Sequence, residues 1–231
     1  MEILKLNTSS WGITLDNIHF VIDAHFSSTK QWDCLSDHEK KFHKASFFIV
    51  TQGDKKHFDI PSYKYVPQDR PLLIPSDLHY KAKKFLGNPT HVLTPGTPFI
   101  YETLKISGNP SGNTLFDWVL LKSTQCYYYL IEGKEGSVLV SGYIPNVTQI
   151  NFNHDLKRPF VCLLPFGMKP SNKMLGGPLL NPAMVNNVFV QLKSDYLIPT
   201  ADNMSQMMTL VRGSDNEKKI LFVETGQKIT I

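Results

Sequence analysis

The clearest pattern in the chain is the alternation of side chains between Gly136 and Gly167. Residues 138–143 alternate with a period of two, which places successive side chains on opposite faces of a β-sheet. Pro145 ends this strand because proline has no N–H to donate to the ladder. Residues 160–166 form a second run that is apolar on both faces. No catalytic signature interrupts either run, so they predict packed strands rather than an active site.

Similar runs recur along the chain and predict an all-β fold. A jelly-roll or Greek-key β-sandwich core is expected over residues 99–231, with an N-terminal extension over residues 1–98. One short helix is predicted at Ser36, where Glu39 completes a capping box. The segments interpreted as strands are 2–8, 11–26, 45–52, 99–107, 114–122, 125–132, 137–144, 149–152, 160–166, 188–198, 207–213, 220–224 and 228–231.

Residues 54–98 have a different character because prolines recur through them. Prolines disrupt central strands, so the segment is predicted to be a long, ordered connection lying across the domain or a neighbour. A second long connection, rich in glycine, proline and asparagine, is predicted over residues 167–187. The prolines of the first connection are Pro61, Pro67, Pro71, Pro75, Pro89, Pro95 and Pro98.

Composition adds a low charge density and one basic segment. Of the 231 residues, 42% are hydrophobic and 19% are charged, with a formal net charge of +4. A low-charge surface suits a protein covered by partners, or one with a larger core than usual. The segment 40–84 could contact phosphates of RNA, or could be an ordinary solvated face. Its basic residues are Lys40, Lys41, Lys44, Lys55, Lys56, Lys64, Arg70, Lys81, Lys83 and Lys84, against Asp54, Asp59, Asp69 and Asp77.

The cysteines and the N-terminus indicate an intracellular setting. Cys34, Cys126 and Cys162 form an odd set without CxxC spacing, which fits a reducing compartment. The first residues do not resemble a signal peptide, so secretion is not expected. No apolar run reaches the length of a membrane span, and no membrane contact is predicted.

One group of residues was weighed as a metal site. Asp23 and His25 would share a strand face, and Cys34, His38 and His43 follow within about twenty residues. The spacing of His38 and His43 does not place both on one helical face. Ordinary polar surface is the preferred interpretation, with convergence of Asp23, His25, His38 and His43 on a metal left open. No catalytic, cofactor-binding or metal residue is predicted, and no cofactor.

From residue 118 to about residue 215 the chain resembles the jelly-roll capsid proteins of picorna-like viruses. The resemblance lies in Gly136 followed by alternating hydrophobics and Pro145, in the Pro165-Phe166 pair that ends a strand, and in a glycine-rich loop. A strand ending at Pro199 and the run 210–215 complete it. The resemblance implies a jelly-roll subunit that assembles with copies of itself or with related subunits.

The prediction from sequence is therefore a structural protein of a viral shell, located in the virion or host cytoplasm, and not an enzyme. The loops 167–187 and 54–98 would make contacts between subunits. Two alternatives stay open. One is a monomeric intracellular β-sandwich module that binds carbohydrate or peptide, with Tyr127–Tyr129 as a possible stacking surface. The other is a metal-dependent enzyme with its metal near His25.

Overall fold

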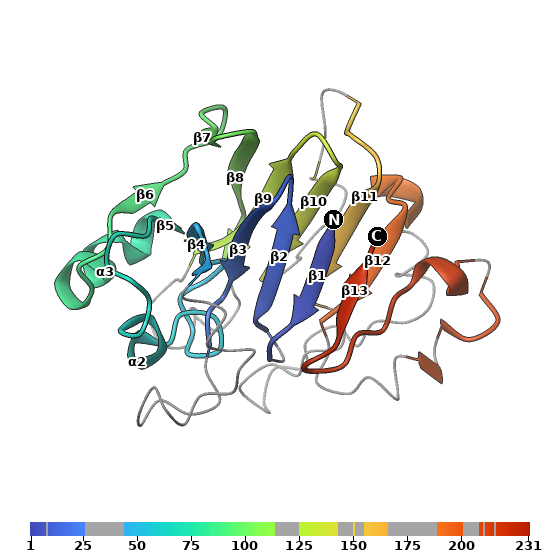
Figure 1. Cartoon of the computed structure of the whole chain (residues 1–231), viewed down its shortest axis with the longest axis horizontal. Coiled ribbons are helices and arrows are strands. Elements are labelled where there is room, and N and C mark those ends of the chain that lie inside the picture. Colours follow the sequence, from blue (N-terminus) through green and yellow to red (C-terminus); the bar gives the residue numbers. More distant parts are fainter. Residues whose placement is uncertain are drawn as a thin grey trace.

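The computed structural model describes residues 1–7, 9–25, 44–113, 125–142, 150, 155–165, 189–200, 208–209, 211–214 and 216–231. Thirteen strands in this part of the chain form two sheets. The first sheet has the order β13-β1-β2-β3-β4-β5-β6, and the second has the order β12-β11-β10-β9-β8-β7. Figure 1 shows the two sheets facing each other, with α2 and α3 beside β4, β5 and β6.

The first sheet is built mostly from the N-terminal part of the chain. Its strands β1, β2, β3 and β13 are antiparallel neighbours, whereas β3, β4, β5 and β6 are parallel. The bounds are β1 (Glu2–Lys5), β2 (Trp11–Leu15), β3 (Ile18–Ile22), β4 (Phe47–Ile49), β5 (Leu72–Ile74), β6 (Thr90–Val92) and β13 (Lys228–Thr230).

The second sheet also combines both kinds of pairing. Strands β7 to β10 are antiparallel, and β10, β11 and β12 are parallel. The bounds are β7 (Phe99–Tyr101), β8 (Leu104–Asn113), β9 (Gln125–Glu132), β10 (Ser137–Ser141), β11 (Phe160–Leu164) and β12 (Tyr196–Pro199).

Helices and turns cover the outer faces of the sheets. The helices are α2 (Ile60–Tyr63) and α3 (His79–Phe85), with 3₁₀ turns η3 (Ser76–Leu78) and η5 (Glu217–Lys219). One hydrophobic cluster lies between the sheets, and a second lies between the first sheet and α2, η3 and α3. A third packs the second sheet against Phe189, Leu192, Val211 and Ile220. The layers are thus helix, sheet, sheet and a further outer layer.

The predicted all-β jelly roll is wrong. Jelly rolls are antiparallel, whereas both sheets here contain adjacent parallel strands, and parallel neighbours need crossover connections outside the sheet. The alternation of side chains with a period of two predicts strands, but it does not show whether neighbouring strands are parallel or antiparallel. Strands predicted at 137–144 and 160–166 are confirmed as β10 and β11. The division into parts at residue 98 stays a prediction.

The proline-rich segment 54–98 is also not the extended arm that was predicted. It contains α2, β5, η3, α3 and β6, and β5 is a central strand between β4 and β6. The strand is possible because its three residues fit between Pro71 and Pro75, so neither proline interrupts its ladder. Asp59 caps α2 by accepting a hydrogen bond from Ser62 N at 3.1 Å, with proline in the first turn.

Other strand predictions have different outcomes. Residues 189–192 are helical, so the strand predicted over 188–198 is reduced to β12. Residues 208, 209 and 211 are helical as well. The predicted helix at Ser36, the strands at 114–122 and 149–152 and the loop 167–187 lie outside the described residues. No helix among the described residues is long and apolar enough to cross a membrane.

Candidate active site

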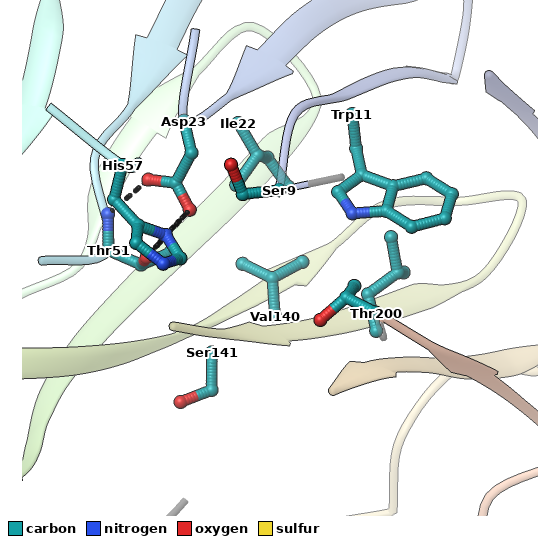
Figure 2. A pocket seen from close by; sticks show the side chains of 10 residues that line it. Ser9, Trp11, Ile22, Asp23, Thr51, His57, Val140, Ser141 and Thr200 are labelled. Carbon is teal, nitrogen blue, oxygen red and sulfur yellow. Dashed lines mark hydrogen bonds and ion pairs between the residues drawn. The ribbon is translucent and has the colours of Figure 1, made fainter. Parts of the chain in front are cut away.

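A small cavity lies where the ends of strands from both sheets meet (Figure 2). The first sheet supplies Asp23, directly after β3, and Thr51, just after β4. The second supplies Ser141 at the end of β10 and Thr200 directly after β12. Parallel neighbours end at the same edge of a sheet, which is where ligands bind in open α/β proteins. The cavity volume of about 10 Å³ suits one water molecule or one ligand oxygen.

Asp23 is the centre of the polar side of this cavity. Its side chain is buried and accepts hydrogen bonds from Thr51 N and Thr51 Oγ1, each at 2.7 Å. His57 Nδ1 lies 2.8 Å from Asp23 Oδ2. The backbone of Asp23 has φ of 50°, a left-handed conformation that aspartate tolerates better than most residues. Its N–H donates to Ile49 O at 2.8 Å, which ties the turn after β3 to β4.

His57 reaches the cavity from a compact turn that begins at Asp54. Asp54 Oδ1 accepts from Lys56 N at 2.7 Å, and Asp54 O accepts from His57 N at 3.1 Å. The next residue, Phe58, is buried in the cluster behind the first sheet and fixes the other end of the turn. His57 Nδ1 faces Asp23, whereas Nε2 lies 3.8 Å from Asp54 Oδ2, beyond hydrogen-bond distance. The imidazole is therefore oriented through Nδ1, with Nε2 left for another partner.

Burial and the pairing with Asp23 act in opposite directions on His57. Burial disfavours the charged imidazolium, but the negative charge and hydrogen bond of Asp23 outweigh it and raise the pKa of His57. Burial also raises the pKa of Asp23, against the lowering influence of His57 and Thr51. The 2.8 Å contact allows Nδ1–H to donate to Oδ2, and Nε2 is then the ring nitrogen that can exchange a proton.

Trp11 forms the opposite side of the cavity. It begins β2, is 2% exposed, and its indole N–H has no hydrogen-bond partner among the described residues. Figure 2 shows the indole nitrogen on the edge of the ring turned toward the other lining residues. Ser9 lies nearby and donates to Lys56 O at 2.6 Å, which connects this side to the His57 turn. Ile22, Val140 and Leu163 supply apolar walls.

The residues considered from sequence meet this site only in part. Asp23 is central to it, but its partner is His57 and not His25. The positive φ of Asp23 ends the strand alternation on which the pairing with His25 was based, and His25 Nδ1 instead lies 3.5 Å from Asn7 Nδ2. Cys34, His38 and His43 lie outside the described residues. Among those described, no three His, Cys, Asp or Glu side chains are grouped so that they could hold a metal ion.

Sequence reasoning missed His57, Thr51 and Trp11. The only local signal was the change from the apolar run 47–50 to a polar turn ending in His57. Tyr127 and Tyr129, considered as a stacking surface, are buried between the sheets, and Tyr128 faces the opposite cluster. The predicted alternation of these tyrosines is confirmed. Their burial removes Tyr127 and Tyr129 from any stacking surface.

No protein-family model and no curated protein matches the chain. Solved structures do match it over its full length. An isothiocyanate hydrolase from Delia radicum gut bacteria has a TM-score of 0.76 and 13% identity, covering 100% of this chain and 99% of the other. A possible metal-dependent hydrolase from Veillonella parvula has a TM-score of 0.78 and 11% identity, with 100% and 99% covered. A metallo-β-lactamase fold protein from Bacillus subtilis has a TM-score of 0.64 and 11% identity, with 99% and 98% covered.

These matches correct the resemblance to viral capsid proteins and what it implied. The predictions of a shell protein without enzymatic activity and of capsid-subunit partners, with RNA contact through residues 40–84 inside such a shell, are wrong, because the solved structures that share this fold are named as hydrolases or as a diiron β-hydroxylase and not as capsid proteins. The strand-and-turn motifs that suggested a capsid also arise in other sandwiches of two sheets. Among the interpretations left open, the metal-dependent enzyme agrees best with the neighbours. The two mixed sheets with helices outside them are the metallo-β-lactamase fold.

Proposed function

We propose that the protein is a hydrolase in which His57, oriented by Asp23, accepts a proton from the attacking water. The observation that carries the proposal is the buried 2.8 Å contact between Asp23 and His57 beside a cavity of water-molecule size. Structural neighbours that are an isothiocyanate hydrolase and a possible metal-dependent hydrolase support the same reaction class. A perturbed ionisable pair in a cavity at strand ends is typical of functional sites.

A metal centre of the kind that metal-dependent hydrolases of this fold contain is not matched by the described residues of this chain. Zinc in catalytic sites takes three protein ligands. Here Asp23 is occupied by Thr51 and His57, and the other nearby carboxylate, Asp54, accepts from Lys56 N and from the Gln52 amide. The remaining lining side chains are hydroxyls, an indole and aliphatic groups. The proposed reaction therefore uses no step through a metal.

The chain's own groups can move the proton in the proposed reaction. Nδ1 of His57 donates to Asp23, which fixes the tautomer in which Nε2 carries a lone pair. Nε2 takes a proton from water as the water oxygen attacks the substrate, and the imidazolium is stabilised by the buried carboxylate. The same proton then passes from Nε2 to the leaving group. Thr51 holds Asp23 in place through two hydrogen bonds and takes no proton.

The direct test is hydrolysis of a small panel of chromogenic substrates: a carboxylic ester, a thioester and a phosphodiester. At least one is expected to be hydrolysed, and His57→Gln is expected to lower kcat/KM about 100-fold or more. The matched control is His79→Gln, since His79 pairs with Thr90 at 3.1 Å and does not line the cavity. The wild-type rate should rise with pH, with its midpoint above the ordinary histidine pKa of 6.5.

Two results would contradict the proposal. One is a His57→Gln variant with the wild-type rate. The other is activity that a chelator abolishes and an added divalent metal restores, which would place the reaction on a metal held elsewhere in the chain. Metal analysis of the active protein before and after dialysis separates the second result from loss of folding.

A further inference from the structure

The indole N–H of Trp11 is a polar group of the cavity that the proposed proton transfer does not use. It is buried and without a hydrogen-bond partner among the described residues, although it lines a cavity with room for one oxygen atom. Tryptophan can only donate at this position, so the missing partner must be an acceptor. A buried donor left unpaired costs about 1–3 kcal/mol, which an acceptor entering the cavity would recover.

The surroundings of the indole favour an oxygen that carries negative charge. Lys5 is buried, and its ammonium lies 5.5 Å from the centre of the Trp11 ring. Ile22, Val140 and Leu163 form apolar walls, which lower the local dielectric and strengthen a hydrogen bond to an anion. Asp23 is the carboxylate that the described residues supply to the cavity lining, and it is engaged by Thr51 and His57.

We propose that the Trp11 indole N–H binds the carbonyl oxygen of an acyl substrate, an ester or a thioester, and stabilises the oxyanion formed from it. This inference rests on the proposed function and names its substrate class. Trp11 and His57 lie on opposite sides of the cavity (Figure 2), so a carbonyl oxygen inside it accepts from the indole on one side and faces the base on the other. Because the cavity has room for about one oxygen atom, the acyl carbon and the attacking water would lie at its opening.

A phosphoryl group fits the same walls less well. It spreads charge over three oxygens in the transition state, and sites that transfer it supply several cationic or metal partners. Among the described residues, this cavity offers space for a single oxygen and one donor without a partner, and neither lysine nor arginine lines it. A tetrahedral intermediate of acyl transfer places charge on one oxygen, which one strong donor in a dry site can stabilise.

The reaction balances with the groups on these two sides. The water oxygen forms a bond to the acyl carbon, its proton moves to His57 Nε2, and the carbonyl electrons move to the oxygen bound by Trp11. The oxyanion collapses, the bond to the alkoxide or thiolate breaks, and the proton on Nε2 passes to that leaving group. The products are a carboxylic acid and an alcohol or thiol, with no oxidant or further reactant needed.

The kinetic test removes the donor and keeps the shape of the ring. Trp11→3-benzothienylalanine replaces the indole N–H by sulfur, and Trp11→Phe is the simpler variant. With a 4-nitrophenyl ester as substrate, kcat should fall about 100-fold while KM changes little, because the hydrogen bond strengthens only when the oxyanion forms. Ile13→Val is the matched control, since it removes a methylene group from the same strand at a buried position that does not line the cavity. A benzothienyl variant with wild-type kcat would overturn the proposal.

If no hydrolysis is found, a binding experiment can still test whether the Trp11 indole N–H binds an oxygen atom. In protein labelled with ¹⁵N-tryptophan, the Trp11 indole resonance is identified by its loss in Trp11→Phe. Acetate, as a small probe with a negatively charged carboxylate oxygen, should shift the indole proton resonance downfield in a saturable way. A shift without hydrolysis keeps the oxygen site and rejects the proposed hydrolase. No shift up to high acetate concentration, together with unchanged kcat in the benzothienyl variant, rejects the oxygen site and leaves the hydrolase standing.

Discussion

The two sheets make unequal contributions to one cavity. Among the described residues, the ionisable side chains that line the cavity, Asp23 and His57, come from the first sheet and the turn after β4, and Asp23 is also the lining residue with positive φ. The second sheet supplies Val140, Ser141, Leu163 and Thr200, all uncharged. Both sheets place the ends of parallel strands at the cavity, but only the first sheet and its turn supply ionisable groups among the described residues. The arrangement of strands therefore does not determine by itself where the reactive groups lie. The first sheet supplies the reactive groups, and the second closes the space around them.

The largest effect is expected from Asp23→Ala. The change leaves Thr51 N, Thr51 Oγ1 and His57 without their shared acceptor in a buried place. We expect a loss of about 3–5 kcal/mol in the free energy of unfolding, measured by urea denaturation. Thr200→Val on the second sheet keeps the shape of the side chain and should cost much less. Equal losses at both positions would remove the distinction between the sheets.

Gly142→Ala should give the next largest loss of stability. It tests whether the absence of a side chain after β10 leaves the space that Thr51 of the first sheet occupies. A Cβ at Gly142 would lie 2.3 Å from Thr51 Oγ1 and 3.0 Å from Thr51 Cβ, so it must displace the hydroxyl that holds Asp23. We expect a loss of about 1–3 kcal/mol in unfolding free energy.

The double variant Gly142→Ala with Thr51→Ala tests the cause of that loss. Removing the Thr51 hydroxyl removes the nearest clash, so the two losses should not add, and the cycle should show coupling of about 0.5–3 kcal/mol. Additive losses would show that the alanine acts through other neighbours, such as Gln52, whose Cδ lies 3.2 Å from the added Cβ.

A smaller effect is expected from pH. The folded-state pKa of His57 is raised, so its contribution to stability is fully present below about pH 6.5 and is lost as pH rises through the folded pKa. The raised pKa of Asp23 acts in the same direction, beginning at its ordinary value of 3.8. We expect the unfolding free energy to fall by at most about 1.4 kcal/mol per pH unit above pH 6.5.

Chemical denaturation at a series of pH values measures this slope. His57→Gln should flatten it, whereas His91→Gln, at an exposed position in β6, should keep it. If the slope of unfolding free energy against pH is unchanged in His57→Gln, the pH dependence comes from other titratable groups and not from His57.

The smallest effect is expected from Ser141→Ala on the second sheet. The hydroxyl lines the cavity but carries no charge, so the loss in unfolding free energy should be at most about 1 kcal/mol. Calorimetry resolves a change of this size. A loss comparable with that of Asp23→Ala would mean that the second sheet contributes to the polar centre and not only to its walls.

The sequence predicted individual strands far better than their arrangement. The patterns at 137–144 and 160–166 predicted β10 and β11, because the burial of one or both faces of a strand determines which residue types occur within the strand itself. That β10 and β11 run parallel depends on the path of the chain between them, which no local pattern records. The sequence did not predict the short strand Leu72–Ile74, because prolines on both sides usually indicate irregular structure. This strand is short enough to fit between them.

The site was harder to predict for the same reason. Asp23 was singled out, but its partner His57 lies 34 residues away and comes from a turn after another strand. His25 is closer to Asp23 in the sequence, but the left-handed backbone at Asp23 makes the side chains of Asp23 and His25 point in different directions. Trp11 carried no signal, since an unpaired indole N–H is visible only when its surroundings are known.

The pairing of β1 with β13 bears on the order in which the protein can fold during synthesis. Lys228 Nζ contacts Glu2 Oε1 at 2.8 Å, and Ile231 N donates to Met1 O at 3.0 Å, so the first strand is completed by the last (Figure 1). During synthesis, this edge of β1 stays unpaired until the chain has been made as far as β13, which begins at Lys228. Until then it presents unpaired N–H and C=O groups with which the strands of other chains can pair.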